Sequence, residues 1–157
     1  MISTSGNNLS ISAADLTLDG SIAAGAGSVT ITRSGMGTIG LGTAMGDLML
    51  SGSELGRIIS TNMTIGGTTI TGLTVNGVTA TNSNGIAETM TLKAGAGTIT
   101  FNGTESVFNA LDAQASGGIT VSAALSTDSG KMRLDGNSDG MGTDKITLGA
   151  NITADIP

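Results

Sequence analysis

The stretch DGNSDGMGTD, residues 135–144, places side chains that carry oxygen atoms at alternate positions and then turns through glycine. This spacing matches the start of a calcium-binding loop, in which alternate side chains point at one hard cation and glycine allows the sharp turn. The candidate ligands are Asp135, Asn137, Asp139, the carbonyl group of Met141, and Asp144. We expect any ion held here to be a structural Ca²⁺, because it would neutralise clustered carboxylates and hold a long corner loop in place.

The same stretch also fits a turn that binds no metal. In an EF-hand the last ligand of the loop is a Glu and helices flank the loop, whereas Ile146 stands at that position here, inside an expected strand. Asp and Asn form tight turns without any ion. The sequence leaves both interpretations open.

The missing residue types exclude several classes of function. The 157 residues include no His, Cys, Trp or Tyr and only 2 Phe, so there is no imidazole base, no thiolate nucleophile and no ordinary zinc or haem site. Hydrolases with a Ser-His-Asp or Cys-His centre are thereby excluded. The net charge of -6 repels phosphate backbones, so we expect no nucleic-acid partner.

Pairs of carboxylates are the enzymatic chemistry that remains, because two such groups can cleave a glycosidic bond. Asp128 with Asp135, or Glu54 with Glu88, could be proposed, but neither spacing supports a pair and no aromatic platform for a sugar accompanies them. We therefore expect that the protein is not an enzyme. A β-helix that binds or cleaves glycans in a groove lined by Asp and Asn is the alternative.

Short segments with a period of two recur along the whole chain. Each has an apolar residue, a residue that is usually small and polar, and a second apolar residue, with turn-forming residues between segments. This pattern is typical of short strands with one buried face. The segments begin at Leu16, Val29, Ile39, Leu48, Met63, Leu73, Met90, Ile99, Ile119, Met132 and Ile146.

Two stretches could form single helical turns instead. SGSELGRIIS begins with a capping-box pattern of Ser51 and Glu54, and TESVFNALDAQ spaces Val107, Phe108 and Leu111 as in a helix. A bulged strand with the apolar side chains pointing inward fits each stretch equally well.

We expect a single domain over residues 1–157, built as a parallel β-helix, or β-solenoid. RSGMGTIGLG, from Arg33, is similar to KAGAGTITFNG, from Lys93, and such repeated strand-turn units bury their apolar faces only by stacking. At roughly 20 to 25 residues per coil the chain makes about six or seven coils, and the bias of crossovers favours a right-handed helix. A Greek-key sandwich is the alternative, but it would have larger core residues and longer strands.

The stretch GTIGLGTAMGDLMLSGSELGRIISTNMTIGG, residues 37–67, resembles the modules of giant bacterial surface proteins known as β-strand repeat proteins, which are similar in style to filamentous haemagglutinin. Residues 116–154 resemble the second half of such a module. The resemblance implies a module of a longer exported polypeptide that acts in adhesion, biofilm or the cell-surface coat. It extends to the repeat region alone, because the Asn-Pro motifs of the haemagglutinin secretion domain are missing and the sole proline is Pro157.

We therefore expect a structural or adhesive module at the bacterial cell surface. The last coil of a solenoid presents unpaired backbone groups, so copies should stack head to tail into filaments or a surface layer. Surface glycans are the other partner considered. The first residues, MISTSGNNLS, show no signal-peptide pattern, and no apolar run is long enough to span a membrane.

Threonine pairs such as those at Thr30, Thr69 and Thr98 raise one remote hypothesis, an ice-binding solenoid. That function needs a flat ladder of outward threonines. The irregular spacing of the pairs predicts that they do not form one aligned face, and Thr is also a good polar residue for the outside of any strand.

Overall fold

The computed structural model describes residues 1–155, which form an all-β fold of parallel sheets with two single-turn helices. Sheet A contains β1 (Ile2–Ser3), β3 (Ile22–Gly25) and β7 (Ile58–Ser60). Sheet B contains, in spatial order, β16 (Met132–Asp135), β13 (Ala110–Ala115), β10 (Thr89–Ala94), β8 (Met63–Gly67), β4 (Val29–Arg33) and β2 (Leu9–Ala13). Sheet C contains β17 (Ile146–Leu148), β14 (Ile119–Val121), β11 (Thr98–Phe101), β9 (Ile70–Asn76), β5 (Gly37–Gly42) and β6 (Leu48–Leu50). Sheet D contains β12 (Ser106–Phe108), β15 (Leu125–Thr127) and β18 (Ile152–Ala154), and the helices are α1 (Gly52–Leu55) and α2 (Ala80–Ser83).

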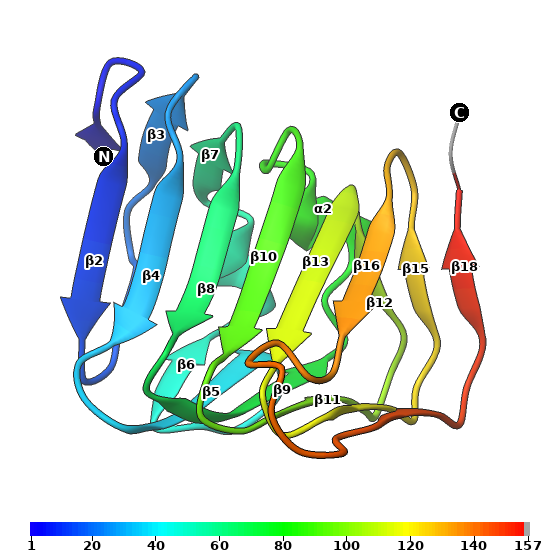
Figure 1. Ribbon diagram of the computed structural model, residues 1–157. Coiled ribbons are helices and arrows are strands. Elements are labelled where there is room, and N and C mark those ends of the chain that lie inside the picture. Colours follow the sequence, from blue (N-terminus) through cyan, green and yellow to red (C-terminus); the bar gives the residue numbers. More distant parts are fainter. Residues whose placement is uncertain (156–157) are drawn as a thin grey trace.

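Apart from β5 and β6, which both belong to sheet C, consecutive strands of the chain belong to different sheets. The chain enters sheet A with β3, sheet B with β4 and sheet C with β5, and then returns to the same sheets in the same order with β7, β8 and β9. Each returning strand lies parallel to the one before it. Figure 1 shows the result in sheet B, where the strands stand side by side from β2 in blue to β16 in orange.

The parallel register sorts the side chains into columns. In sheet C one inward column is Leu48, Ile39, Leu73, Ile99, Ile119 and Ile146. All of these are buried except Ile146, which lies on the last strand of the sheet. The two phenylalanines, Phe101 and Phe108, are the largest fully buried side chains. The core is therefore a stack of apolar columns.

The strand pattern of the sequence is largely confirmed. Every expected apolar-polar-apolar segment lies in a strand except Leu16–Leu18, which forms none. The prediction of a strand there was wrong because this segment lies beside β6 without forming backbone hydrogen bonds to it. Side-chain carboxylates accept the hydrogen bonds of the backbone amides instead.

The two ambiguous stretches resolve differently. Ser51 caps α1, with its side chain accepting from the Glu54 amide and the Glu54 side chain accepting from the Ser51 amide, as the capping box predicts. The helical interpretation of Val107 to Leu111 was wrong, since these residues belong to β12 and β13. Helix α2 was not anticipated. Within residues 1–155 no helix is long and apolar enough to cross a membrane.

The connection between β5 and β6 is unusually short for parallel neighbours, which are normally joined by a long crossover. Residues 43–47 fold back directly over the outer surface of β5. A Cβ atom added to Gly40 would lie 2.3 Å from the Ala44 carbonyl oxygen, and one added to Gly46 would lie 2.4 Å from the Gly40 nitrogen. The two glycines allow this close approach, and the connection places β6 on the edge of sheet C.

We predict that Gly40→Ala lowers the free energy of unfolding by about 1–3 kcal/mol, because the added methyl group overpacks against the Ala44 carbonyl. Urea unfolding measures the difference. Gly72→Ala is the matched control on sheet C, since its Cβ would meet nothing closer than Thr38 Cγ2 at 3.5 Å. Equal stability of the two variants would contradict this account of the connection.

Candidate functional site

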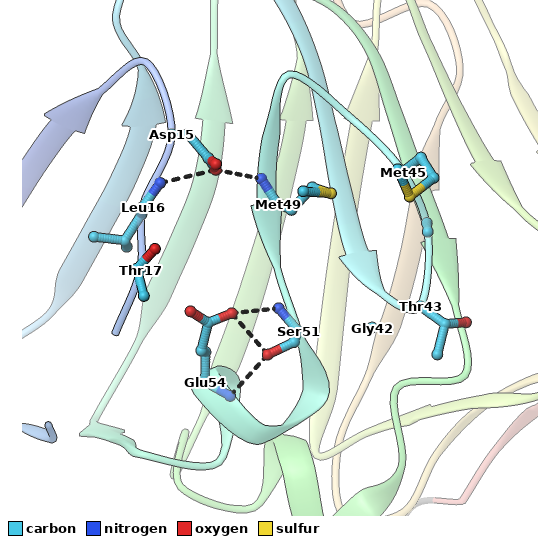
Figure 2. A pocket seen from close by; sticks show the side chains of 10 residues that line it. Asp15, Leu16, Thr17, Gly42, Thr43, Met45, Met49, Ser51 and Glu54 are labelled. Carbon is cyan, nitrogen blue, oxygen red and sulfur yellow. Dashed lines mark hydrogen bonds between the residues drawn. The ribbon is translucent and has the colours of Figure 1, made fainter. Parts of the chain in front are cut away.

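A cavity of about 270 Å³ lies where the segment after β2 meets β6 and α1. Its lining is mainly apolar and includes two carboxylates, Asp15 and Glu54 (Figure 2). The complete lining is Asp15, Leu16, Thr17, Gly42, Thr43, Ala44, Met45, Met49, Ser51 and Glu54. Asp15 and Glu54 are the ionisable side chains in this lining, so the chemical properties of the cavity depend on them.

One carboxylate oxygen of Asp15 accepts hydrogen bonds from two backbone amides. Its Oδ1 accepts hydrogen bonds from the Leu16 N–H and the Met49 N–H, both at 2.9 Å (Figure 2). Met49 is in the edge strand β6, so this carboxylate occupies a place where a neighbouring strand would otherwise bind. The hydrogen bond from Met49, and then that from Leu16, lower the pKa of Asp15.

Glu54 acts in the same way from α1. Its Oε1 accepts from the Leu18 N–H and its Oε2 from the Ser51 N–H, each at 2.9 Å, and the Ser51 hydroxyl donates to Oε2 at 2.7 Å. Burial raises the pKa of Glu54, but these hydrogen bonds, with the charge of Arg57, outweigh it and bring the pKa below its usual value. Arg57 Nη1 also donates to the Leu18 carbonyl at 2.5 Å.

We call Asp15 and Glu54 the carboxylate clasp. Together they bind four backbone amides and join the segment 15–18 to β6 without a backbone ladder. Because the pKa of each lies below its ordinary value, both are ionised near neutral pH. A glycosidase of the acid-base kind needs one protonated carboxyl group, and neither member of the clasp supplies it.

The other carboxylates considered for glycan cleavage have separate surroundings. Glu88 Oε2 accepts from Asn62 Nδ2 at 3.3 Å, whereas Glu54 binds the amides named above. Asp135 Oδ2 accepts from Arg133 Nη2 at 2.6 Å, and no hydrogen bond or ion pair in residues 1–155 links it to Asp128.

The expected calcium loop forms a series of Asx turns between β16 and β17. Asp135 Oδ1 accepts from the Asn137 amide at 3.2 Å, and Asp139 Oδ1 accepts from the Met141 amide at 3.0 Å. Asn137 Oδ1 is buried and has no hydrogen-bond partner. Asp144 and Met141 are exposed. Across residues 1–155 no three carboxylates lie close enough together to hold a metal ion, so calcium binding stays a prediction.

The threonine pairs do not form one aligned face, as expected, because Thr30 lies on β4 of sheet B and Thr98 on β11 of sheet C; single threonines, however, do align. On the outer side of sheet C, Thr74, Thr100, Thr120 and Thr147 occupy one registered column. On sheet B, Thr30, Thr64 and Thr91 form another. These columns form because the strands pair in register although loops of unequal length separate them.

Sequence reasoning missed Asp15 entirely, and it considered Glu54 only for the capping box and for a carboxylate pair with Glu88. Asp15 is bonded to an amide 34 positions along the chain, and Glu54 to one 36 positions back. The one local signal was that Asp15 immediately precedes an apolar-Thr-apolar segment, where a strand edge was expected.

Comparison of the chain with protein-family models, with curated proteins and with solved structures gives no match.

We predict that stability falls as the solution is acidified through the depressed pKa values of the clasp. A carboxyl group whose pKa is lower in the folded state stabilises the fold above its unfolded-state pKa, and this contribution is lost as pH falls through the folded-state pKa. Urea midpoints measured from about pH 7 to about pH 2.5 should therefore decrease most steeply below about pH 4.

The variant Asp15→Asn keeps an oxygen acceptor for both amides but does not titrate, so its profile should be flatter than that of the parent protein. Asp19→Asn, at an exposed site nearby, is the matched control. Identical profiles for Asp15→Asn and the parent protein would show that the clasp contributes nothing to the acid response.

Proposed function

We propose that the chain is a structural or adhesive module of a bacterial surface protein, folded as a right-handed parallel β-solenoid of about six or seven coils. The repeated order of sheets and the registered columns support the solenoid. The resemblance of residues 37–67 and 116–154 to β-strand repeat modules supports the surface role. In this proposal the module works outside the cell through its length, its rigidity and its ends, and it binds copies of itself or surface glycans.

The observation that carries self-association is the end formed by β16, β17 and β18. Within residues 1–155 each of these strands pairs on one side only. In β17, Ile146 is 42% exposed and Leu148 59%, although they continue columns that are buried one strand earlier. Unpaired strand edges with apolar side chains accept further strands, so a second copy stacked on this end would complete the columns.

We predict that the protein associates reversibly as its concentration rises, and that Leu148→Lys weakens the association by placing a charge in an apolar column. Sedimentation velocity over a wide range of concentrations measures both, and electron microscopy shows whether filaments form. Met141→Lys is the matched control, because Met141 is 68% exposed and lies outside the strands. A monomer at every concentration would contradict the proposal.

We also propose that the loop 135–144 binds a structural Ca²⁺. The buried, unpartnered Asn137 Oδ1 supports this, because a cation would satisfy it. The ion would have to compete with Arg133, which donates to Asp135 at 2.6 Å.

Calcium should therefore raise the melting temperature of the parent protein, and Asn137→Ala should remove the rise. Ser138→Ala, one position along in the same loop, is the control. Equal melting curves in calcium and in chelator would retire this site.

Ice binding is the second candidate, and the threonine column Thr74, Thr100, Thr120 and Thr147 is the observation that favours it. Strands in a sheet are spaced about 4.8 Å apart, so these threonines recur at a regular interval along sheet C. Thermal hysteresis decides the matter: a freezing point below the melting point would establish ice binding, and its absence would leave the column as ordinary strand surface.

A further inference from the structure

The cavity between Asp15 and Glu54 carries negative charge and has no cationic side chain in its lining. Both carboxylates are ionised near neutral pH, because the pKa of each lies below its ordinary value. The other residues that line the cavity are uncharged. The Arg57 guanidinium donates to the Leu18 carbonyl and lies outside the lining. A molecule that enters the cavity therefore meets two negative charges.

The clasp leaves one oxygen of Asp15 unused. A carboxylate offers about four acceptor positions on its two oxygens. Oδ1 accepts from the Leu16 and Met49 amides, whereas Oδ2 accepts no hydrogen bond within residues 1–155. In the same part of the chain no ion pair involves Asp15. Because the two amides already fix this side chain, Oδ2 can accept from a ligand with little further loss of side-chain freedom.

Apolar side chains form much of the remaining lining, namely Leu16, Ala44, Met45 and Met49. Met45 is 78% exposed and Met49 38%, so both can contact a bound molecule. In Figure 2, Asp15 and Glu54 lie at one side of the cavity and Met45 at the other, with Met49 between them. Methionine is flexible and polarisable, and it adapts to the shape of an apolar group. The cavity thus offers a charged side and an apolar side to one ligand.

Other classes of ligand match this lining less well. An anion would be repelled by the two carboxylates. Ca²⁺ and Mg²⁺ take about six or more oxygen ligands, and in residues 1–155 no three carboxylates lie close enough together to hold a metal ion. A sugar ring usually packs on an aromatic side chain, and the lining has none. An organic cation with an apolar part is the class that matches both sides.

We propose that this cavity binds a small primary alkylammonium ion, which donates an N–H to Asp15 Oδ2 and packs its alkyl chain against Met45 and Met49. The cavity of about 270 Å³ is smaller than the pockets of roughly 300–1,000 Å³ that hold drug-sized molecules. The ligand is therefore a short-chain amine. This inference is independent of self-association, because the site lies within one copy of the chain.

Titration with n-butylammonium, followed by NMR of the methionine methyl groups, tests the site. We expect saturable shifts at Met45 and Met49 with a dissociation constant on the order of millimolar, because so few non-hydrogen atoms limit the binding free energy. Met36, which is 67% exposed and lies outside the lining, is the internal control and should not respond. n-Butanol has the same chain without the charge and should bind more weakly.

Two matched variants test the role of the charge. Asp15→Asn keeps an oxygen acceptor for the Leu16 and Met49 amides but replaces the second oxygen with a donor, so the affinity for n-butylammonium should fall at least about three- to fivefold. Asp19→Asn removes the same charge from an exposed residue outside the lining and should leave the affinity unchanged. Urea unfolding confirms that both variants are folded.

Three results would overturn the site. A shift at Met36 as large as that at Met45, or an equal loss of affinity in Asp19→Asn and Asp15→Asn, would show only a general attraction of amines to an acidic surface. Binding of n-butanol as tight as that of n-butylammonium would show that the carboxylates do not select a cation. None of these results bears on the proposed self-association, which sedimentation velocity tests separately.

Discussion

The parallel ladder of backbone hydrogen bonds is the constraint on which the rest of this structure depends. In a parallel sheet with no slip of register, each residue lies directly beside its equivalents on the neighbouring strands. A position that points inward on one strand therefore points inward on all of them. The column that runs from Ile39 through Leu73 to Ile99 and Ile119 has to be apolar throughout. Because of the ladder, an apolar residue at an inward position of one strand requires apolar residues at the registered positions of the other strands in the sheet.

The same ladder explains the unusual composition. The apolar columns consist mainly of aliphatic side chains, and the two aromatic ones, Phe101 and Phe108, are both fully buried. Where the chain turns, backbones come so close that side chains are excluded: a Cβ on Gly97 would lie 1.8 Å from the Thr71 carbonyl oxygen. The abundance of glycine, 26 of 157 residues, follows in part from such corners.

Local pattern predicted many of the strands but failed at Leu16–Leu18, and the capping box at Ser51 and Glu54 indicated α1 while leaving a bulged strand equally open. Register was beyond reach of local pattern, because it depends on where loops of unequal length return the chain to a sheet. The threonine column shows this. Thr74, Thr100, Thr120 and Thr147 lie on successive strands of sheet C, yet the number of residues from Thr100 to Thr120 is smaller than that from Thr120 to Thr147. The spacing of Val107, Phe108 and Leu111 also suited a helix, and only pairing with distant strands made it β-structure. The Asx turns of residues 135–141 could be predicted from their composition, unlike the contact between Asp135 and Arg133.

The site that pattern missed is a place where the ladder is interrupted. Inserting β6 beside β5 leaves the segment 15–18 next to a strand edge to which it does not bind through its own backbone. Amides left unpaired at such a junction would each cost free energy, and Asp15 and Glu54 remove that cost by accepting from four of them. A carboxylate suits this task because it offers several acceptor positions and its charge strengthens each bond. In the sheets, neighbouring segments are joined by hydrogen bonds between uncharged backbone groups. At this junction they are joined by two ionised side chains instead. Stability at this junction is therefore coupled to pH, whereas the ladders on either side of it are not.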